Sequence, residues 1–285
     1  MADRNQDTPL ADPVSFDAPP VSEVALGVQF AAPVADDAVA LADFWPQIRD
    51  QFPDLERHEA IDRIDESFGP AAPSQQFQIN LGVEPRRYWF VSADKRWLVQ
   101  VQPDRFVFNW RRQGDDEAYP RYRSLRRRFE ELYRTFAASV GEERLAANPP
   151  EWCATTYVNN ILASSSADPA TRLPLGHILR FVSSPKSSVL PPLEDTALQQ
   201  RHLLPSRVPG EAPQGRLYIK ANPAFRANDQ LPGYVVELKV LARPDAHSRA
   251  AVMRCLDQGR DLIVRSFKDI TTPAMHKQWG LQDAK

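Results

Sequence analysis

One order of predicted elements recurs in this 285-residue chain: an alternating apolar strand, a short helix, further strands and a long helix. In residues 21–30, apolar side chains occupy every second position at Val24, Leu26, Val28 and Phe30, as in a strand with one buried face. The β-rich run at residues 152–161 opens the second half in the same way. The two halves share an order of elements and little direct sequence identity.

Short strands separated by turn residues follow the opening strand of each half. The first half is predicted to contain a helix over residues 36–52 and then strands at 77–83, 87–92, 97–102 and 105–111. The second half is predicted to contain a helix at 173–181 and strands at 215–221 and 233–242. Residues 54–74 are polar and show no clear period.

A long amphipathic helix closes each half. Apolar residues in the first recur at the spacing of one helical face, namely Leu125, Phe129, Leu132 and Phe136. This pattern predicts a helix from about Pro120 to Val140, with Gly141 as its C-cap. The second predicted helix begins near Asp245, a favourable N-cap residue. Its apolar face carries Val252, Leu256, Ile263 and Phe267.

These elements predict an α+β fold of two β-α-β(3–4)-α halves, with a curved antiparallel sheet and helices on one face. Such a duplicated sheet would be similar to the TATA-binding-protein fold, and a helix-grip fold is the alternative. The predicted boundaries are a disordered leader at 1–20, a first half at 21–148 and a second half at 149–285. A proline-rich insertion occupies residues 183–214.

Composition restricts the function classes. A formal net charge of −2 gives no overall basic field for binding nucleic acid or an anionic membrane. The N-terminal residues do not resemble a signal peptide, and no apolar stretch approaches the roughly 20 residues that span a bilayer. We therefore expect a cytoplasmic protein that does not bind a membrane. Cys153 and Cys255 are expected to be buried free thiols.

A search for catalytic and ligand-binding motifs gives a negative result. The chain has no glycine-rich phosphate loop, no Cys-x-x-Cys pair and no Gly-x-Ser-x-Gly nucleophile motif. Its five histidines are dispersed, and the acidic residues between 56 and 66 alternate with arginines, as on a solvated surface. The sequence thus predicts neither an enzyme, nor a metal site, nor a cofactor.

One local feature indicates a binding surface. Arginines and aromatic residues are concentrated in the Arg105–Arg134 region, a combination that suits phosphate contacts, stacking and protein recognition. Carboxylates in the same window offset much of this charge, so a solvated helix face is the simpler interpretation. The predicted partner-binding residues are Arg111, Arg112, Tyr119, Tyr122, Arg123, Arg126 and Arg127.

Several polar residues interrupt otherwise apolar segments. Asn109, Asn159 and Asn160 place amides in strands, where β-branched residues are usual. We interpret them as structural groups at bulges or turns, with the lining of a groove as the alternative. His276 and Trp279 follow the last predicted helix and are expected to hold the C-terminus on the sheet.

Several motifs together resemble a sporadically distributed bacterial family of uncharacterised proteins. They span most of the chain: residues 19–24 (Pro-Pro-Val-Ser-Glu-Val), 102–112 (Gln-Pro-Asp-Arg-Phe-Val-Phe-Asn-Trp-Arg-Arg), 119–122 (Tyr-Pro-Arg-Tyr), 157–161 (Tyr-Val-Asn-Asn-Ile) and 276–280 (His-Lys-Gln-Trp-Gly). The resemblance implies no established activity. The patchy distribution of that family suggests accessory genes, such as defence or toxin–antitoxin loci.

Three functional hypotheses follow. The first is a non-enzymatic binding or regulatory protein with a macromolecular partner, and a protein partner ranks ahead of nucleic acid. The second is a small-molecule binder or enzyme with a cavity between the sheet and the helices. The third is a nucleic-acid binder that uses the Arg105–Arg134 region, for which binding would weaken steeply with salt.

Overall fold

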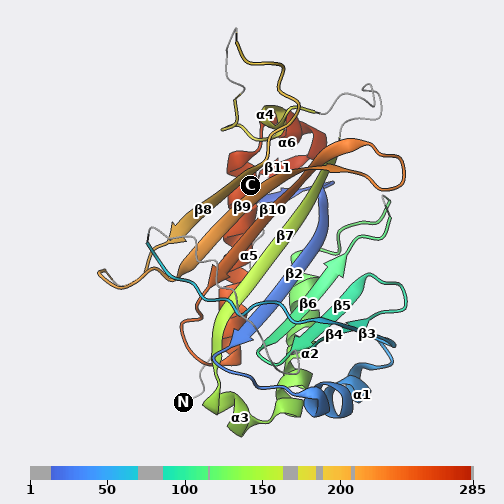
Figure 1. Ribbon diagram of the computed structural model, residues 1–285, viewed down its shortest axis with the longest axis vertical. Helices are drawn as coiled ribbons and strands as arrows, with labels where there is room; N and C mark the ends of the chain where they lie inside the picture. Colours follow the sequence, from blue (N-terminus) through green and yellow to red (C-terminus); the bar gives the residue numbers. More distant parts are fainter. Residues whose placement is uncertain are drawn as a thin grey trace.

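The computed structural model describes residues 14–69, 86–114, 116–162, 173–183, 189–206 and 209–283. Nine strands form one antiparallel sheet in the order β3-β4-β5-β6-β2-β7-β10-β9-β8 (Figure 1). In that order, the strands are Asp54–Glu59, Arg86–Val91, Trp97–Gln102, Arg105–Arg111, Val21–Phe30, Pro150–Leu162, Pro232–Ala242, Gly215–Phe225 and Leu198–Leu204. The predicted α+β fold with a large antiparallel sheet is therefore confirmed.

The opening strands of the two predicted halves are neighbours at the centre of this sheet. β2 and β7 pair antiparallel, with Val24 opposite Tyr157. On their outer sides lie β6 and β10, which are the last sheet strands before the long helix of each half. Because the side chains of a strand alternate between faces, the register of these pairs fixes which residues point toward the helices.

The long helices α2 (Tyr122–Val140) and α5 (Arg249–Ile270) lie on one face of the sheet, behind the strands in Figure 1. The apolar residues predicted to face the core on each helix are buried. Aromatic rings fill much of the core: Phe136 lies 4.9 Å from Phe106 and 5.6 Å from Phe44, centroid to centroid. No described helix is long and apolar enough to cross a membrane.

Shorter elements complete the described chain. They are the π-helical segment η1 (Val39–Phe44), the helices α1 (Trp45–Ile48), α3 (Glu142–Ala147), α4 (Leu175–Ile178) and α6 (Pro273–Trp279), and the strands β1 (Val14–Phe16) and β11 (Leu281–Asp283). β1 and β11 pair in a separate two-stranded sheet, which brings the two ends of the described chain together.

Several boundaries differ from the sequence predictions. The last helix begins after Ser248, whose hydroxyl accepts from the Ala251 amide at 3.2 Å, whereas Asp245 forms an ion pair with Arg254. The helix expected over 36–52 ends earlier, at the end of α1. β1 lies within the expected leader, and β8 lies within the proline-rich insertion. The strand predicted at 77–83 falls outside the described residues.

Candidate ligand pocket and open sheet face

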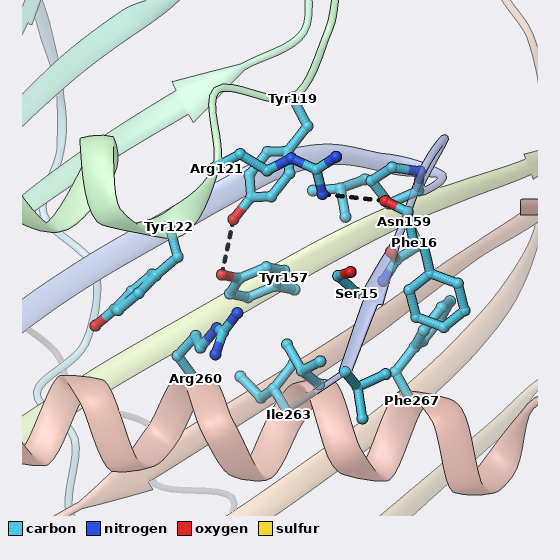
Figure 2. A pocket seen from close by; sticks show the side chains of 14 residues that line it. Ser15, Phe16, Tyr119, Arg121, Tyr122, Tyr157, Asn159, Arg260, Ile263 and Phe267 are labelled. Carbon is cyan, nitrogen blue, oxygen red and sulfur yellow. Dashed lines mark hydrogen bonds between the residues drawn. The ribbon is translucent and has the colours of Figure 1, made fainter. Parts of the chain in front are cut away.

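A small pocket lies between the sheet and helix α5. It has a volume of about 60 Å³, and its walls come from β1, β7, α5 and the segment before α2 (Figure 2). Phe16, Ile263 and Phe267 provide an apolar wall, while Tyr157 and Arg260 bring polar groups to the other side. The arrangement can hold a small apolar group with one polar end.

Two tyrosine hydroxyls meet at this pocket. The hydroxyl oxygens of Tyr119 and Tyr157 are 3.0 Å apart, so one donates a hydrogen bond to the other. Burial, together with the neighbouring Tyr157, raises the pKa of Tyr119 well above its ordinary value. The Tyr119 phenol therefore stays protonated at physiological pH and acts as a hydrogen-bonding group.

Asp257 collects hydrogen bonds beside the pocket. Its carboxylate accepts from the Tyr122 hydroxyl at 2.8 Å and from Nε of Arg126 at 2.8 and 3.0 Å. Burial and the nearby Asp257 raise the pKa of Tyr122 well above its ordinary value. The guanidinium of Arg260 lies 5.5 Å from the centre of the Tyr122 ring. The negative charge of Asp257 is therefore neutralised by Arg126, and the hydroxyl of Tyr122 stabilises it further.

Arg121 has an unusual backbone conformation where the pocket meets α2. Its φ of 65° falls in a region that residues other than glycine seldom adopt. Its guanidinium Nη1 donates to the carbonyl of Phe16 at 3.0 Å and so joins the start of α2 to β1. Residues with such strained backbones are concentrated at functional sites.

The opposite face of the sheet, which we call the open face, carries a chain of polar side chains. Asn109 donates to Glu23 at 2.6 Å, Gln100 donates to Asn109 at 2.8 Å, and Arg87 donates to Gln100 at 3.3 Å. This network crosses four adjacent strands, β2, β6, β5 and β4. Burial raises the pKa of Glu23, although Asn109 and Arg111 act in the opposite direction.

Trp89 lies at the end of this network and is surrounded by basic side chains. The guanidinium carbons of Arg87 and Arg111 lie 5.3 and 5.5 Å from its ring centre, within cation–π range. The ring of His58 lies 4.0 Å away, centroid to centroid. We call Arg87, Trp89, Arg111 and His58 the tryptophan cluster.

Residues 60–69, which we call the strap, cross the open face from β3 toward β9 (the cyan trace in Figure 1). Gln102 and Gln29 bind the strap main chain, and Nη2 of Arg105 donates to the Asp62 carbonyl at 2.9 Å. At the far end, Glu66 binds the side chains of Arg216 and Tyr218. The strap crosses the sheet where Gln102 pairs with Arg105, whereas Arg111 of the tryptophan cluster lies at the other end of β6.

The structure divides the predicted partner-binding residues among four locations. Arg111 lies on the open face, whereas Tyr119, Tyr122 and Arg126 lie at or beside the pocket, on the helix side of the sheet. Arg123 and Arg127 are exposed on α2, and Arg112 donates to the Pro19 carbonyl at 3.3 Å. The seven residues therefore do not form one surface.

The predicted structural polar residues have separate roles. Asn109 belongs to the open-face network, and Asn159 lines the pocket while donating to the Val236 carbonyl at 3.1 Å. The main-chain amide of Asn160 donates to the Pro20 carbonyl at 3.0 Å. His276 hydrogen-bonds to Thr271, and Trp279 stacks on Phe267. These two residues thus hold the C-terminal segment on α5.

Sequence reasoning did not identify Gln29, Gln102, Arg216 or Arg260 as site residues. The alternation of β2 offered a signal, since Val28 and Phe30 point into the core and Gln29 must point to the open face. No signal in the sequence indicated the position of the strap. The described residues contain no cluster of three or more histidine, cysteine, aspartate or glutamate side chains that could hold a metal ion.

Comparison with known proteins leaves the geometry as the basis for a functional conclusion. The sequence matches no protein-family model and no curated protein.

Proposed function

We propose that this chain is a non-enzymatic binding protein that recognises a partner protein through the open face of its sheet. The tryptophan cluster is the observation that carries the proposal. Tryptophan and arginine are enriched among the residues that dominate protein interfaces. The neighbouring hydrogen-bond network holds Arg87 in place before binding, which lowers the entropic cost of ordering it.

Unsatisfied donors in the cluster support the same proposal. In the described part of the chain, Nε of Arg87, Nε1 of Trp89 and Nε of Arg111 are buried and have no hydrogen-bond partner. Each such group costs about 1–3 kcal/mol. A partner whose acceptor groups reach these donors as the arginine side chains move would relieve part of this cost.

The distribution of charge favours a protein over nucleic acid. On the open face, Glu23 and Glu237 lie among the basic residues Arg111 and Lys239, so positive and negative groups alternate. Nucleic acid requires a continuous positive surface that neutralises several phosphates. The exposed Arg127 lies on α2, which covers the other face and does not extend such a surface.

Two finer statements belong to this proposal. The first is that the sheet is a duplicated saddle similar to that of TATA-binding protein, which would make the open face its binding surface. The second is that the protein acts in the cytoplasm of a bacterium, in a defence or toxin–antitoxin context. The symmetric placement of β6 and β10 around β2 and β7 supports the first statement, and the family resemblance supports the second.

Capture from a native-level cell extract tests the proposal. We expect the wild-type chain and Arg127→Glu to retain the same protein, and Arg111→Glu to lose it. Arg127 is the matched control because it is an exposed arginine on the opposite side of the sheet. Capture should survive nuclease treatment. The proposal fails if Arg111→Glu retains the protein as well as the wild type does, or if the wild type retains none.

A second candidate function is the binding of a small apolar carboxylate in the pocket beside α5. The observation that favours it is the convergence of Tyr119, Tyr157 and Arg260 on an apolar wall. A thermal-shift titration with acetate, which is small enough for a pocket of about 60 Å³, tests it: the wild type should be stabilised, and Ile263→Trp, which fills the pocket, should not. Equal shifts in both proteins, or no shift in the wild type, would exclude this site.

A further inference from the structure

We infer that the open face binds an extended acidic peptide of the partner, and that the strap occupies this peptide site as an intramolecular stand-in. This inference rests on the proposed function and specifies the chemistry of the partner.

Two glutamine side chains bind the strap by its main chain. Oε1 of Gln102 accepts from the Ile61 amide at 3.2 Å, and its Nε2 donates to the Ile61 carbonyl at 3.0 Å. Gln29 makes the same pair of hydrogen bonds to Ile64, at 2.8 and 2.9 Å. A side chain that bonds to both the N–H and the C=O of one residue recognises extended backbone regardless of sequence.

A buried arginine at the far end recognises a carboxylate. Arg216 is only 5% exposed, and it binds the Glu66 carboxylate together with the Tyr218 hydroxyl. The same guanidinium donates to the Ser67 carbonyl at 2.7 Å and lies 4.9 Å from the ring centre of Phe68. The site therefore selects a carboxylate two residues after the backbone bound by Gln29, followed by an aromatic ring.

The strap does not fill this site. An open pocket of about 260 Å³ remains between the strap and strands β9 and β10. Lys220, Lys239 and Tyr218 line it together with Glu237 and with the strap residues Asp62 and Asp65. Burial lowers the pKa of Lys239. Lys220 already pairs with Glu237 at 3.9 Å, so Lys239 is the base that an additional carboxylate of a longer acidic peptide would meet in this space.

The strap is held by polar contacts rather than by apolar burial, so a peptide that makes the same contacts can replace it. None of residues 61–69 is buried, and the Ile61 side chain is 41% exposed, so its release uncovers little apolar surface. Hydrogen bonds hold it, and each contributes about 1 kcal/mol net. Moreover, Glu59 of β3 pairs with Arg86 of β4, so a tight turn would suffice to join these strands. A connection as long as residues 60–85 is unusual unless it has a function.

A labelled peptide with the sequence of residues 59–69 tests the inference by fluorescence anisotropy. The receptor is the full chain with Ile61→Pro and Ile64→Pro, which removes the two amides that Gln102 and Gln29 bind. We expect it to bind the peptide at least about tenfold more tightly than the wild type does. In the wild type, the tethered strap competes at a high effective concentration.

Two controls identify the site. Gln29→Ala with Gln102→Ala in the same receptor should abolish binding, whereas Gln200→Ala, a glutamine on the helix side of β8, should leave it unchanged. A peptide that carries Glu66→Gln should bind at least about fivefold more weakly, since a charge-assisted bond is lost. If the double-proline chain does not fold, as judged by circular dichroism, Ile64→Pro alone serves as the receptor.

The inference is overturned if a folded receptor does not bind the peptide, or if the two glutamine substitutions leave binding intact. This result is separable from the proposed function, because the capture experiment depends on Arg111, which lies at the other end of β6 from the strap. Capture that depends on Arg111 without peptide binding would remove the inference alone. If the receptor binds the peptide but the wild-type chain captures no protein, the role assigned to the tryptophan cluster is removed.

Discussion

Arg126 of α2 and Asp257 of α5 form an ion pair that joins the long helices of the two halves. Nε of Arg126 donates to both carboxylate oxygens, at 2.8 and 3.0 Å. The Tyr122 hydroxyl donates to the same carboxylate at 2.8 Å. Because Asp257 is buried and Arg126 is only partly exposed, water replaces these bonds poorly. The pair therefore fixes how the two helices lie against each other.

Asp257→Ala is expected to lower the free energy of unfolding by about 2–4 kcal/mol, because it leaves Tyr122 and Arg126 without their acceptor. Urea denaturation followed by circular dichroism measures this loss. Arg254→Ala is the control: its ion pair with Asp245 is as short, at 2.8 Å, but both side chains are exposed. That variant should change stability by less than about 1 kcal/mol. Equal losses would contradict the role assigned to Asp257.

Gly259→Ala is expected to destabilise the protein even though alanine favours a helix by about 1 kcal/mol. A Cβ at this position of α5 would lie 2.9 Å from Oγ1 and 3.2 Å from Cβ of Thr155 on β7. After the helical gain is subtracted, this crowding should lower the free energy of unfolding by about 1–3 kcal/mol. Thermal denaturation of Gly259→Ala, Thr155→Ala and the double variant checks it. Thr155→Ala removes the 2.9 Å contact with Oγ1 and should therefore relieve part of the clash. A more stable Gly259→Ala would refute close packing here.

Much of the sheet could be predicted because alternation is a local signal. Val24, Leu26 and Val28 define the core face of β2, and the same period identifies β5, β6, β9 and β10. The path of the strap could not be predicted, because its residues show no periodic pattern of burial. Its path depends on hydrogen bonds to Gln29 and Gln102, which are distant in the chain.

The candidate sites were likewise predictable only where a local pattern in the sequence marks them. The sequence indicated the arginine–aromatic region, but it treated Arg111 and Tyr122 as members of one surface. In the structure, the sheet separates them, because Arg111 alternates to the face opposite Trp110, while Tyr122 begins a helix on the core side. The partner of Tyr122 is Asp257 on the last long helix, and no local pattern connects two residues so far apart.

The buried thiols should react slowly in the native protein. A hydrogen bond with Cys255 and burial raise the pKa of Cys153 well above its ordinary value, so little thiolate is present at pH 8. We expect a thiol reagent such as Ellman's reagent to modify the native chain on the order of a hundredfold more slowly than the urea-unfolded chain. Ile61→Cys, on the exposed strap, should react rapidly in the native state. Fast native modification of both natural cysteines would contradict their burial.

Glu23 should make stability depend on pH. Burial raises its pKa in the folded protein above the ordinary value of 4.5. Between those two pKa values the folded state binds more protons than the unfolded state, so the contribution of Glu23 to stability falls as pH rises. Glu23→Gln removes this titration while keeping an oxygen that accepts from Asn109. The variant should therefore match the wild type near pH 4 and exceed its stability at pH 7.

Urea denaturation at the two pH values measures this difference. Glu23→Ala is the control, because it removes both the charge and the acceptor for Asn109. It should be less stable than Glu23→Gln at either pH, by about 1–3 kcal/mol, since a buried amide donor loses its partner. A Glu23→Gln variant that is less stable than the wild type at pH 7 would show that the carboxylate is stabilised by Arg111 more than it is destabilised by burial.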